Sequence, residues 1–197
     1  MSTESRRKIL DAAREEFAAY GLAGARVDRI AASSQCNKQL IYHYFGDKQG
    51  LYDAVLTELV LIARDNQAAA RKKGLSYARD YLGSFDMGTA AQANWARLLA
   101  WEGLTQSPEN AELESIRREN FRNLVRWLEE DQQAGVVTDR FTAEELYAFF
   151  LSATVFPYIL PNVFRLVFGA SEVTPEALAS WRDTLRTLMQ SIGGKSD

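Results

Sequence analysis

The stretch that decides the fold is RVDRIAASSQCNKQLIYHYFGDK, residues 26–48. It contains two short segments, Val27 to Ser34 and Lys38 to Phe45, which a few polar residues separate. In each segment the apolar side chains fall on one face of a helix, and these are Val27, Ile30, Ala31, Ile41 and Phe45. Two short helices joined by a tight turn form a helix-turn-helix, and the sequence predicts this motif here.

The outward face of the second short helix carries side chains that suit double-stranded DNA. Lysine supplies positive charge to phosphates, Asn and Gln can form bidentate hydrogen bonds with adenine, and Tyr and His can donate hydrogen bonds to phosphate oxygens. The residues on this face are Asn37, Lys38, Gln39, Tyr42 and His43. We therefore expect this helix to read the major groove.

The rest of the chain also predicts helices. All four prolines lie at residue 108 or later, and no stretch alternates apolar and polar residues as a strand does. A first helix is expected from Ser2 or Thr3 to Gly21, and a long helix follows the motif at 47–73. Further helices are expected at 75–85, 90–104, 109–133, 142–156 and 175–191. The expected fold is all-α, with a helix-turn-helix domain at residues 1–47 and a helical body at residues 48–197.

Several helix ends carry signals of their own. Capping residues followed by proline or glutamate mark helix starts at Ser107, Thr142 and Thr174. Glycines stand where helices should end, at Gly135, Gly169 and Gly193.

Composition argues against several classes of protein. Hydrophobic residues make up 47% of the chain and charged residues 25%, which is typical of a folded globular protein and not of a disordered one. The one cysteine, Cys36, cannot form an internal disulfide, and we expect it to be a buried structural thiol. With one histidine, His43, few ligands are available for zinc, so neither a metal nor a cofactor is expected.

Motifs of enzymes and of membrane proteins are absent from the sequence. It contains neither H-E-x-x-H nor G-x-G-x-x-G, and Met189 takes the place of the first glycine that a phosphate loop ending at Gly194-Lys195-Ser196 would need. No apolar run approaches the roughly 18 residues that span a bilayer, and the N-terminus has no apolar stretch typical of a secretory signal. We expect a cytoplasmic protein that is not an enzyme and has no membrane partner.

Charge is distributed unevenly along the chain. The formal net charge is -3, which taken alone disfavours a nucleic-acid-binding protein. Residues 1–50, however, carry a net charge of +2 and the remaining residues carry -5. This asymmetry favours a head that faces nucleic acid on an acidic body.

Residues 6–55 resemble the DNA-binding region of the tetracycline-repressor (TetR) family of bacterial regulators. The resemblance rests on Phe17-x-x-Tyr20-Gly21, on Ile30-Ala31, on the run LIYHYF at residues 40–45, and on Lys48. It implies a three-helix DNA-binding head, a ligand-sensing body, and a homodimer formed through two C-terminal helices. It also implies release from a palindromic operator when a small molecule binds, so we expect a transcriptional regulator that acts as a repressor.

The resemblance also assigns residues to the DNA interface. Lys38, Gln39, Tyr42 and His43 match the recognition-helix positions of the family. Tyr44 and Lys48 match positions that commonly contact backbone phosphate, and Arg26 stands at the start of the second helix.

Two residues depart from the family pattern. Gln35 stands in the turn where a glycine is usual, so we expect a residue with a side chain to adopt a positive φ there. Arg26 replaces the usual Ser or Thr, which removes a capping hydroxyl but adds a charge that attracts phosphate.

The body is rich in aromatic residues, most of which must belong to its core. Some of them are expected to line a pocket for an apolar or aromatic ligand, because pockets in the family lie among the middle helices. The candidate pocket residues are Trp95, Leu99, Glu102, Phe121, Trp127 and Phe156. Glu102, if buried, could recognise a hydrogen-bond donor.

The last predicted helix carries an apolar stripe that can pack internally or against a second copy of the chain. We favour the second copy, because a symmetric dimer presents two recognition helices to a pseudo-palindromic site. The candidate interface residues are Phe149, Phe150, Ala153, Leu178, Trp181, Leu185 and Leu188. The expected partners are operator DNA, a second copy and a small-molecule effector.

A different function stays open at this point. A helical protein-protein interaction module that does not bind DNA would suit the acidic total charge. Salt separates the two hypotheses, because phosphate contacts release counterions and weaken steeply with added salt, whereas apolar docking responds much less.

Overall fold

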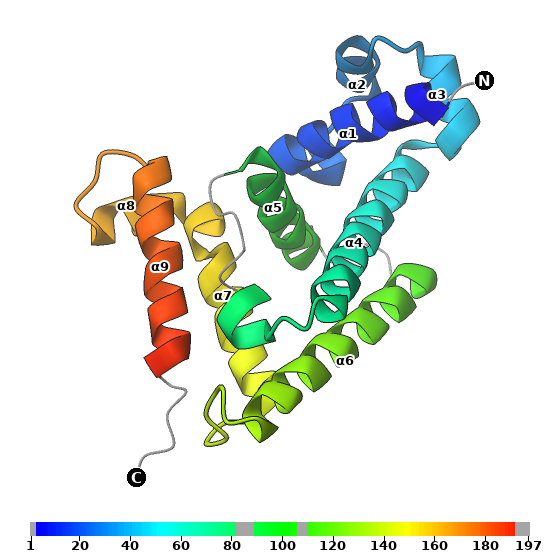
Figure 1. Cartoon of the computed structure of the whole chain (residues 1–197). Coiled ribbons are helices and arrows are strands. Elements are labelled where there is room, and N and C mark those ends of the chain that lie inside the picture. Colours follow the sequence, from blue (N-terminus) through cyan, green and yellow to red (C-terminus); the bar gives the residue numbers. More distant parts are fainter. Residues whose placement is uncertain (1–2, 82–88, 106–109, 192–197) are drawn as a thin grey trace. The chain divides into compact units, whose positions relative to one another are not determined.

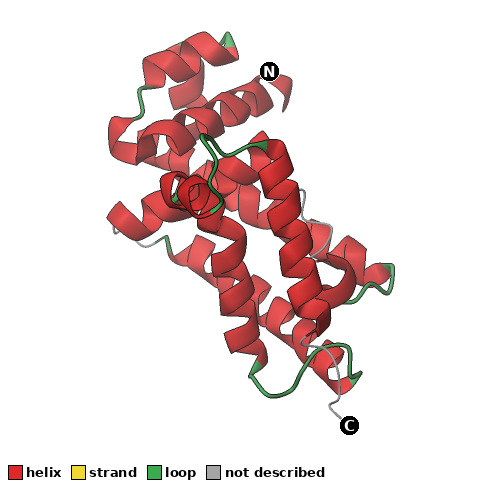
Figure 2. Cartoon of the chain, turned by 90° about the vertical axis from the view of Figure 1, so that its left-hand side faces the viewer, coloured by secondary structure: helices red, strands yellow, loops and turns green. Residues whose placement is uncertain are grey.

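The computed structural model describes residues 3–81, 89–105 and 110–191. Within these ranges every regular element is helical and no strand is present, as Figure 2 shows. The prediction of an all-α fold is therefore confirmed.

The helices lie close to their expected positions. In chain order they are α1 (Thr3–Gly24), α2 (Val27–Ser34), α3 (Lys38–Phe45), α4 (Lys48–Lys72), a π-helical turn η1 (Tyr77–Tyr81), α5 (Ala90–Thr105), α6 (Ala111–Gln133), α7 (Ala143–Ile159), α8 (Pro161–Val167) and α9 (Pro175–Ser191). In place of the helix expected at 75–85, the structure has the π-helical turn η1 at Tyr77–Tyr81. The rest of that expected helix, from residue 82, lies outside the described residues. Helix α8 was not predicted.

The chain forms two compact units. The first contains residues 1–62 and 93–116, and the second contains residues 63–92 and 117–197. One apolar core joins the helices of the first unit, and it includes Ile9, Phe17, Ile30, Ile41, Leu51 and Val55. Because this core continues past residue 47, the start of α4 packs with the three helices before it (Figure 1). We call α1 to α3 with this start of α4 the head.

Helix α1 changes direction at Gly21, where the sequence predicted its end. Gly21 has a φ of 63°, which lies in the left-handed region that glycine adopts most easily, and the helix resumes after it as far as Gly24. A Cβ atom at Gly21 would lie 2.8 Å from the indole ring of Trp101 on α5. The Nε1 of Trp101 donates a hydrogen bond to the carbonyl oxygen of Ala18 at 3.2 Å, which places this ring against the end of α1.

The second unit has its own core, formed by α6, α7, α9 and η1. The buried side chains there include Tyr77, Leu124, Leu128, Leu146, Phe150 and Met189. The capping box at Thr142 and Glu145 is present, and the Oγ1 of Thr174 accepts a hydrogen bond from the backbone N–H of Ala177. The expected start at Ser107 and the expected end at Gly193 lie outside the described residues.

Helix α7 continues past Pro157, although the predicted helix ended at residue 156. Proline has no N–H, so the carbonyl oxygen of Ala153, four residues earlier, loses its helical partner. The indole Nε1 of Trp181 on α9 donates a hydrogen bond to that oxygen at 2.9 Å. A side chain from another helix thus satisfies the carbonyl that the proline leaves free, and α7 extends to Ile159 before Pro161 starts α8.

Trp181→Phe is therefore expected to lower the free energy of unfolding by about 2 kcal/mol, because a partly buried carbonyl loses its donor and the packing around α9 loses volume. Urea unfolding measures this loss. In a Pro157→Ala background the same substitution should lower the free energy of unfolding by a smaller amount, because a backbone N–H at position 157 replaces the indole donor. Equal losses in the two backgrounds would show that the indole does not serve this carbonyl.

No single helix among the described residues is both long and apolar enough to cross a bilayer. The pair α7 and α8 meets the length and composition criteria only when joined across a 95° bend.

Candidate DNA-binding site

Helices α2 and α3 form the expected helix-turn-helix. Ile30 and Ile41 are fully buried, and Val27, Ala31 and Phe45 pack against the same core. Gln35 adopts a φ of 57° in the turn, as expected for a residue that replaces glycine. Its backbone N–H donates to the carbonyl oxygen of Ala32 at 3.3 Å, so the turn closes α2 with a hydrogen bond despite the less favourable backbone conformation.

The turn ends on the cap of α3. The Oδ1 of Asn37 accepts a hydrogen bond from the backbone N–H of Leu40 at 2.7 Å, so this side chain starts the recognition helix. Cys36, beside it, packs against the core of the head but is half-buried and not fully buried as expected. Asn37 was expected to face DNA, and the structure shows that its amide oxygen is already engaged.

The remaining candidate residues of α3 are mostly exposed. Gln39, Tyr42 and His43 lie on the outer face, with 46% of Tyr42 exposed, whereas Tyr44 is half-buried. Lys38 forms an ion pair with Asp28 of α2, and this hydrogen bond, followed by the attraction between the charges, raises the pKa of Lys38. The ion pair therefore favours the charged form of this lysine.

Arg26 lacks a capping hydroxyl, as predicted, and its side chain makes no capping hydrogen bond, but a carboxylate from α1 binds the start of α2 in another way. The Oε1 of Glu16 accepts hydrogen bonds from the backbone N–H of Arg26 and from the Nε of Arg29, both at 2.8 Å. Arg29 in turn donates to the carbonyl oxygen of Gly24 at 3.1 Å, and its guanidinium lies 4.3 Å from the ring centroid of Tyr20. Glu16 thus ties the start of α2 to α1, and we call Glu16, Arg26 and Arg29 the α2 clamp.

Glu16 is a residue that the sequence analysis missed. It lies three residues after Ala13 and one before Phe17, both fully buried, and it is only 9% exposed itself. Burial raises the pKa of its carboxyl group, but the hydrogen bonds from Arg29 and Arg26 and the attraction of their charges outweigh this effect, so the pKa is lowered overall. A carboxylate on the apolar face of the first helix is the signal that could have revealed it.

Two further basic residues lie beside the motif. The Nζ of Lys48 approaches the carbonyl oxygens of Ala23 and Ala25 at 3.4 and 3.3 Å, so it also stabilises the loop between α1 and α2. The guanidinium of Arg6 lies 5.3 Å from the ring centroid of Phe45, which places the start of α1 beside the end of α3 (Figure 1). Arg6 was not among the predicted DNA-binding residues.

Known proteins match the chain over nearly its whole length. Residues 9–55 match the family described as bacterial regulatory proteins, tetR family, and residues 79–185 match the tetracyclin repressor-like C-terminal domain. The HTH-type transcriptional repressor SCO4008 of Streptomyces coelicolor is 31% identical over 188 residues, which cover 94% of this chain and 93% of that protein. The chain belongs to the TetR family.

Other relatives and solved structures agree with this assignment. The HTH-type transcriptional regulator BetI 1 of Chromohalobacter salexigens is 28% identical over 123 residues, 59% of each chain. A putative transcriptional regulator from Streptomyces coelicolor, SCO4942, has a TM-score of 0.72 and 25% identity, and the match covers 95% of this chain and 97% of that one. The hemolysin II transcriptional regulator HlyIIR shares the fold, with a TM-score of 0.65, 21% identity, and coverage of 94% and 97%.

The TetR family is one of transcriptional regulators and not of enzymes. Its members bind operator DNA and small-molecule effectors, typically as dimers. In this TetR-family protein the matched N-terminal region contains the whole of α2 and α3 together with the α2 clamp.

The six candidate effector residues of this TetR-family protein divide between the two units. Trp95, Leu99 and Glu102 lie half-buried on α5 in the first unit. Phe121, Trp127 and Phe156 belong to the second unit, where Phe121 packs against Tyr147 of α7 and Trp127 packs against Tyr77 of η1. Phe156 lies elsewhere in that unit, in an aromatic cluster with Phe164 and Trp181.

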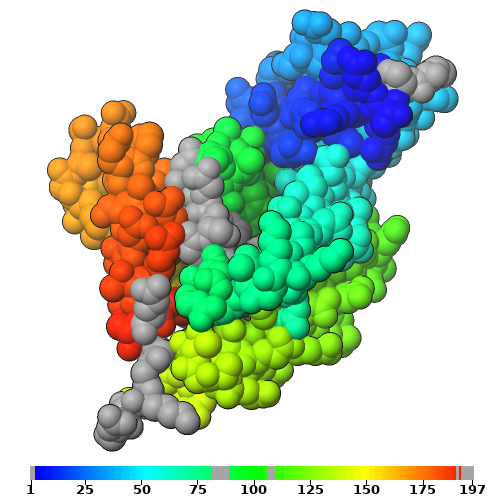
Figure 3. All heavy atoms as spheres, in the orientation of Figure 1, coloured from blue at the N-terminus to red at the C-terminus, as the bar shows by residue number. Residues whose placement is uncertain are grey.

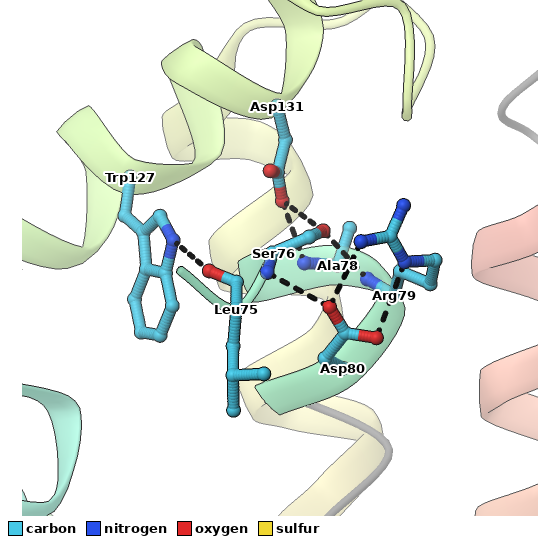
Figure 4. Close-up of polar contacts among 7 residues, drawn as sticks. All are labelled: Leu75, Ser76, Ala78, Arg79, Asp80, Trp127 and Asp131. Carbon is cyan, nitrogen blue, oxygen red and sulfur yellow. Dashed lines mark hydrogen bonds and ion pairs between the residues drawn. The ribbon is translucent and has the colours of Figure 1, made fainter. Parts of the chain in front are cut away.

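Trp127 also takes part in a polar cluster at the start of η1, which Figure 4 shows. Its Nε1 donates to the carbonyl oxygen of Leu75 at 2.9 Å. The Oδ2 of Asp131, one turn further along α6, accepts hydrogen bonds from the Oγ of Ser76 and the backbone N–H of Ala78, both at 2.8 Å. Two side chains of α6 thus hold the segment that precedes η1.

Asp80 completes this cluster from within η1. Its Oδ2 accepts from the backbone N–H of Ser76 at 2.9 Å, and its carboxylate pairs with Arg79. The hydrogen bond from Arg79 and then that from the backbone of Ser76 lower the pKa of Asp80, so it stays ionised. Neither Asp80 nor Asp131 was predicted to have a role.

The candidate dimer residues fall into buried and exposed groups. Phe150, Leu178 and Leu185 are buried within the protomer. These three side chains therefore pack internally, which the apolar stripe also allowed. Trp181 and Ala153 are joined by the hydrogen bond across Pro157 and are partly buried. Phe149 and Leu188 are 52% and 40% exposed and are available to a partner.

Proposed function

We propose that this TetR-family protein is a repressor that binds a palindromic operator as a homodimer and is released by a small apolar or aromatic effector. The observation that carries the proposal is the exposed row Gln39, Tyr42 and His43 on a helix whose start is capped and whose neighbour is held by the α2 clamp. A rigid helix with exposed polar side chains fits major-groove readout. Because operators lie on cytoplasmic DNA in bacteria, we infer that the protein acts in the cytoplasm.

The proposed DNA contacts divide by chemistry. Gln39 reads a base edge, and Tyr42 and His43 donate to phosphates or bases. Arg26, Lys38, Tyr44 and Lys48 contribute to phosphate binding, while Asn37 acts mainly as the cap of α3. Lys48 combines a phosphate contact with its support of the loop carbonyls.

The proposed dimer uses α7 and α9, with α8 beside them. Phe149 and Leu188 supply direct contacts, and the buried Phe150, Leu178 and Leu185 keep their helices in place from inside. Helix α8 adds exposed apolar side chains next to this surface, namely Val163, Leu166, Val167 and the adjoining Phe168. Figure 3 shows α8 and α9 side by side, in orange and red, as the ring contacts of Trp181 with Phe164 and Phe168 require.

The first experiment is selection of bound fragments from random double-stranded DNA by the purified protein, with the oligomeric state measured on the same sample. Enrichment of a palindrome by a dimer supports the proposal and supplies the operator. Failure to enrich any sequence at low salt would overturn it in favour of a helical module that docks a protein partner.

Gln39→Ala is expected to relax the preference for one base pair in each half-site, with a loss of about 1 kcal/mol against the preferred base. Its affinity for random DNA should not change, because no phosphate contact is removed. Tyr42→Ala provides the contrast, since loss of a phosphate donor weakens binding to all sequences alike. Fluorescence anisotropy on single-base operator variants measures both. A uniform loss for Gln39→Ala would show that this side chain does not read a base.

A further inference from the structure

One buried side-chain oxygen of the second unit has no hydrogen-bond partner among the described residues. Asn120 lies on α6 and is only 6% exposed. Its Oδ1 atom is buried and finds no hydrogen-bond partner among the described residues. Leu124 and Trp127, four and seven residues later on the same helix, are buried as well, so Asn120 lies on the inward face of α6.

An unpaired amide oxygen in such a place needs an explanation. Burial without a partner costs about 1 to 3 kcal/mol, and most buried side-chain polar atoms in proteins have a partner. A leucine of similar size would avoid this cost, so the folded chain without a ligand gains no stability from this oxygen. An oxygen of this kind is well suited to accept a hydrogen bond from a bound molecule.

The aromatic side chains on and around α6 indicate the chemical character of a molecule that would bind there. Phe121, the residue that follows Asn120 in the sequence, packs against Tyr147 with ring centroids 5.8 Å apart. Tyr147 lies 6.3 Å from Tyr77, and Tyr77 lies 5.5 Å from Trp127. These four rings, from α6, α7 and η1, form a continuous aromatic row. Its last ring belongs to Trp127, which lies on the same face of α6 as Asn120, two turns further along.

We propose that the Oδ1 of Asn120 accepts a hydrogen bond from the effector, which is therefore a flat, mainly apolar molecule that carries a hydroxyl or N–H donor. The inference rests on the proposed function, since it names the class of the molecule that relieves repression. The aromatic row supplies apolar contact, and the amide selects molecules with a donor over those without one. Specificity of this kind arises because a ligand without the donor leaves the buried oxygen unpaired.

The test compares two probes that differ only in the donor, 2-naphthol and its methyl ether, 2-methoxynaphthalene. Isothermal titration calorimetry with the full chain measures both affinities. We expect the wild-type protein to prefer 2-naphthol by about fivefold, which is the effect of one hydrogen bond. This comparison needs no variant, so it stands whatever a substitution does to folding.

Two variants then assign the preference to Asn120. Asn120→Leu should bind both probes with equal affinity and melt at a higher temperature than the wild type when no probe is present, because it removes the unpaired oxygen. Asn123→Leu is the matched control, since Asn123 lies exposed on the same helix, and it should keep the preference.

Three results would overturn the inference: equal binding of the two probes by the wild type, binding of neither, or a preference that survives in Asn120→Leu. DNA selection on the same preparation separates this failure from that of the proposed function. A selected palindrome without a donor preference rejects the role of Asn120 alone, whereas the absence of any selected DNA rejects the repressor itself.

Discussion

Glu16→Leu is expected to lower the free energy of unfolding by about 2 to 3 kcal/mol, because it removes the acceptor of the hydrogen bonds from Arg26 and Arg29 and the charge that balances Arg29. The backbone N–H of Arg26 and the guanidinium of Arg29 are then left at the start of α2 without their anion. The figure stays below that for a fully buried pair, because the side chain of Arg29 is 38% exposed. Urea unfolding measures the change.

The same substitution should weaken operator binding at least tenfold at a temperature where the variant is folded. Helix α2 packs against α3, so a loose start of α2 lets the recognition helix adopt positions that do not fit the groove, and only a fraction of molecules is competent to bind. The salt dependence of binding should not change, since the phosphate contacts are the same.

A neighbouring glutamate provides the control. Glu15→Leu changes the same residue type at an exposed position of α1 and should leave both stability and operator affinity almost unchanged. If Glu15→Leu and Glu16→Leu have equal stabilities, the α2 clamp has no energetic role. If the two differ in stability but not in affinity, Glu16 supports only the fold.

The α2 clamp should also give the head a dependence on pH. The pKa of Glu16 is lower in the folded protein than its ordinary value of 4.5. Its contribution is therefore complete above that ordinary value and is lost as the pH falls through the lower value of the folded state. Glu16→Gln should unfold with a flatter pH dependence over this acidic range, which thermal melts from pH 3 to pH 6 would detect.

Asp131→Ala is expected to lower the free energy of unfolding by about 3 kcal/mol. Asp131 is 6% exposed, and its Oδ2 is the acceptor for both the Oγ of Ser76 and the backbone N–H of Ala78 (Figure 4). Both donors become unpaired in a buried place when the carboxylate is removed, and hydrogen bonds to a charged acceptor are among the stronger ones in proteins. Glu129→Ala, at an exposed position of the same helix, is the control.

Limited proteolysis gives a second and local measurement for Asp131. Trypsin can cut after Lys72, Lys73 and Arg79, which flank the segment that Asp131 holds. We expect cleavage there to become faster in Asp131→Ala and not in Glu129→Ala, because the segment opens more often without its acceptor. Unchanged cleavage together with unchanged stability would show that Trp127 and Asp80 hold the segment without help from Asp131.

The helix-turn-helix could be predicted because its signals are local. Apolar residues three and four apart, the polar turn and Asn37 ahead of α3 each act within one or two turns of helix, and the structure shows α2 and α3 with the predicted ends. The positive φ of Gln35 was predicted from the same local pattern. Because Ile41 and Phe45 turn one side of α3 toward the core, the opposite side of the helix is exposed.

Features that depend on a distant partner were missed. The end of α7 could not be predicted, because the donor that lets the helix pass Pro157 comes from Trp181, which is 28 residues after Ala153, the residue whose carbonyl it serves. The same bond explains why Trp181, expected at a dimer interface, is used inside the protomer. The stripe Leu178, Trp181 and Leu185 has the same spacing whether it faces its own α7 or a partner, so periodicity alone could not separate the two.

The sequence by itself determined the family, the all-α class, the ends of α2 and α3 and the outward face of α3 that we propose for DNA, because each depends on residue types at short separations along the chain. Only the tertiary structure decided that Glu16 accepts the backbone N–H of Arg26 at the start of α2, that Asp131 holds the start of η1, and that Asn120 is buried with an unpaired oxygen. The physical reason is the same in all three cases. Whether a buried polar atom is paired depends on which groups the fold brings within hydrogen-bonding distance, and that distance is not set by separation along the chain.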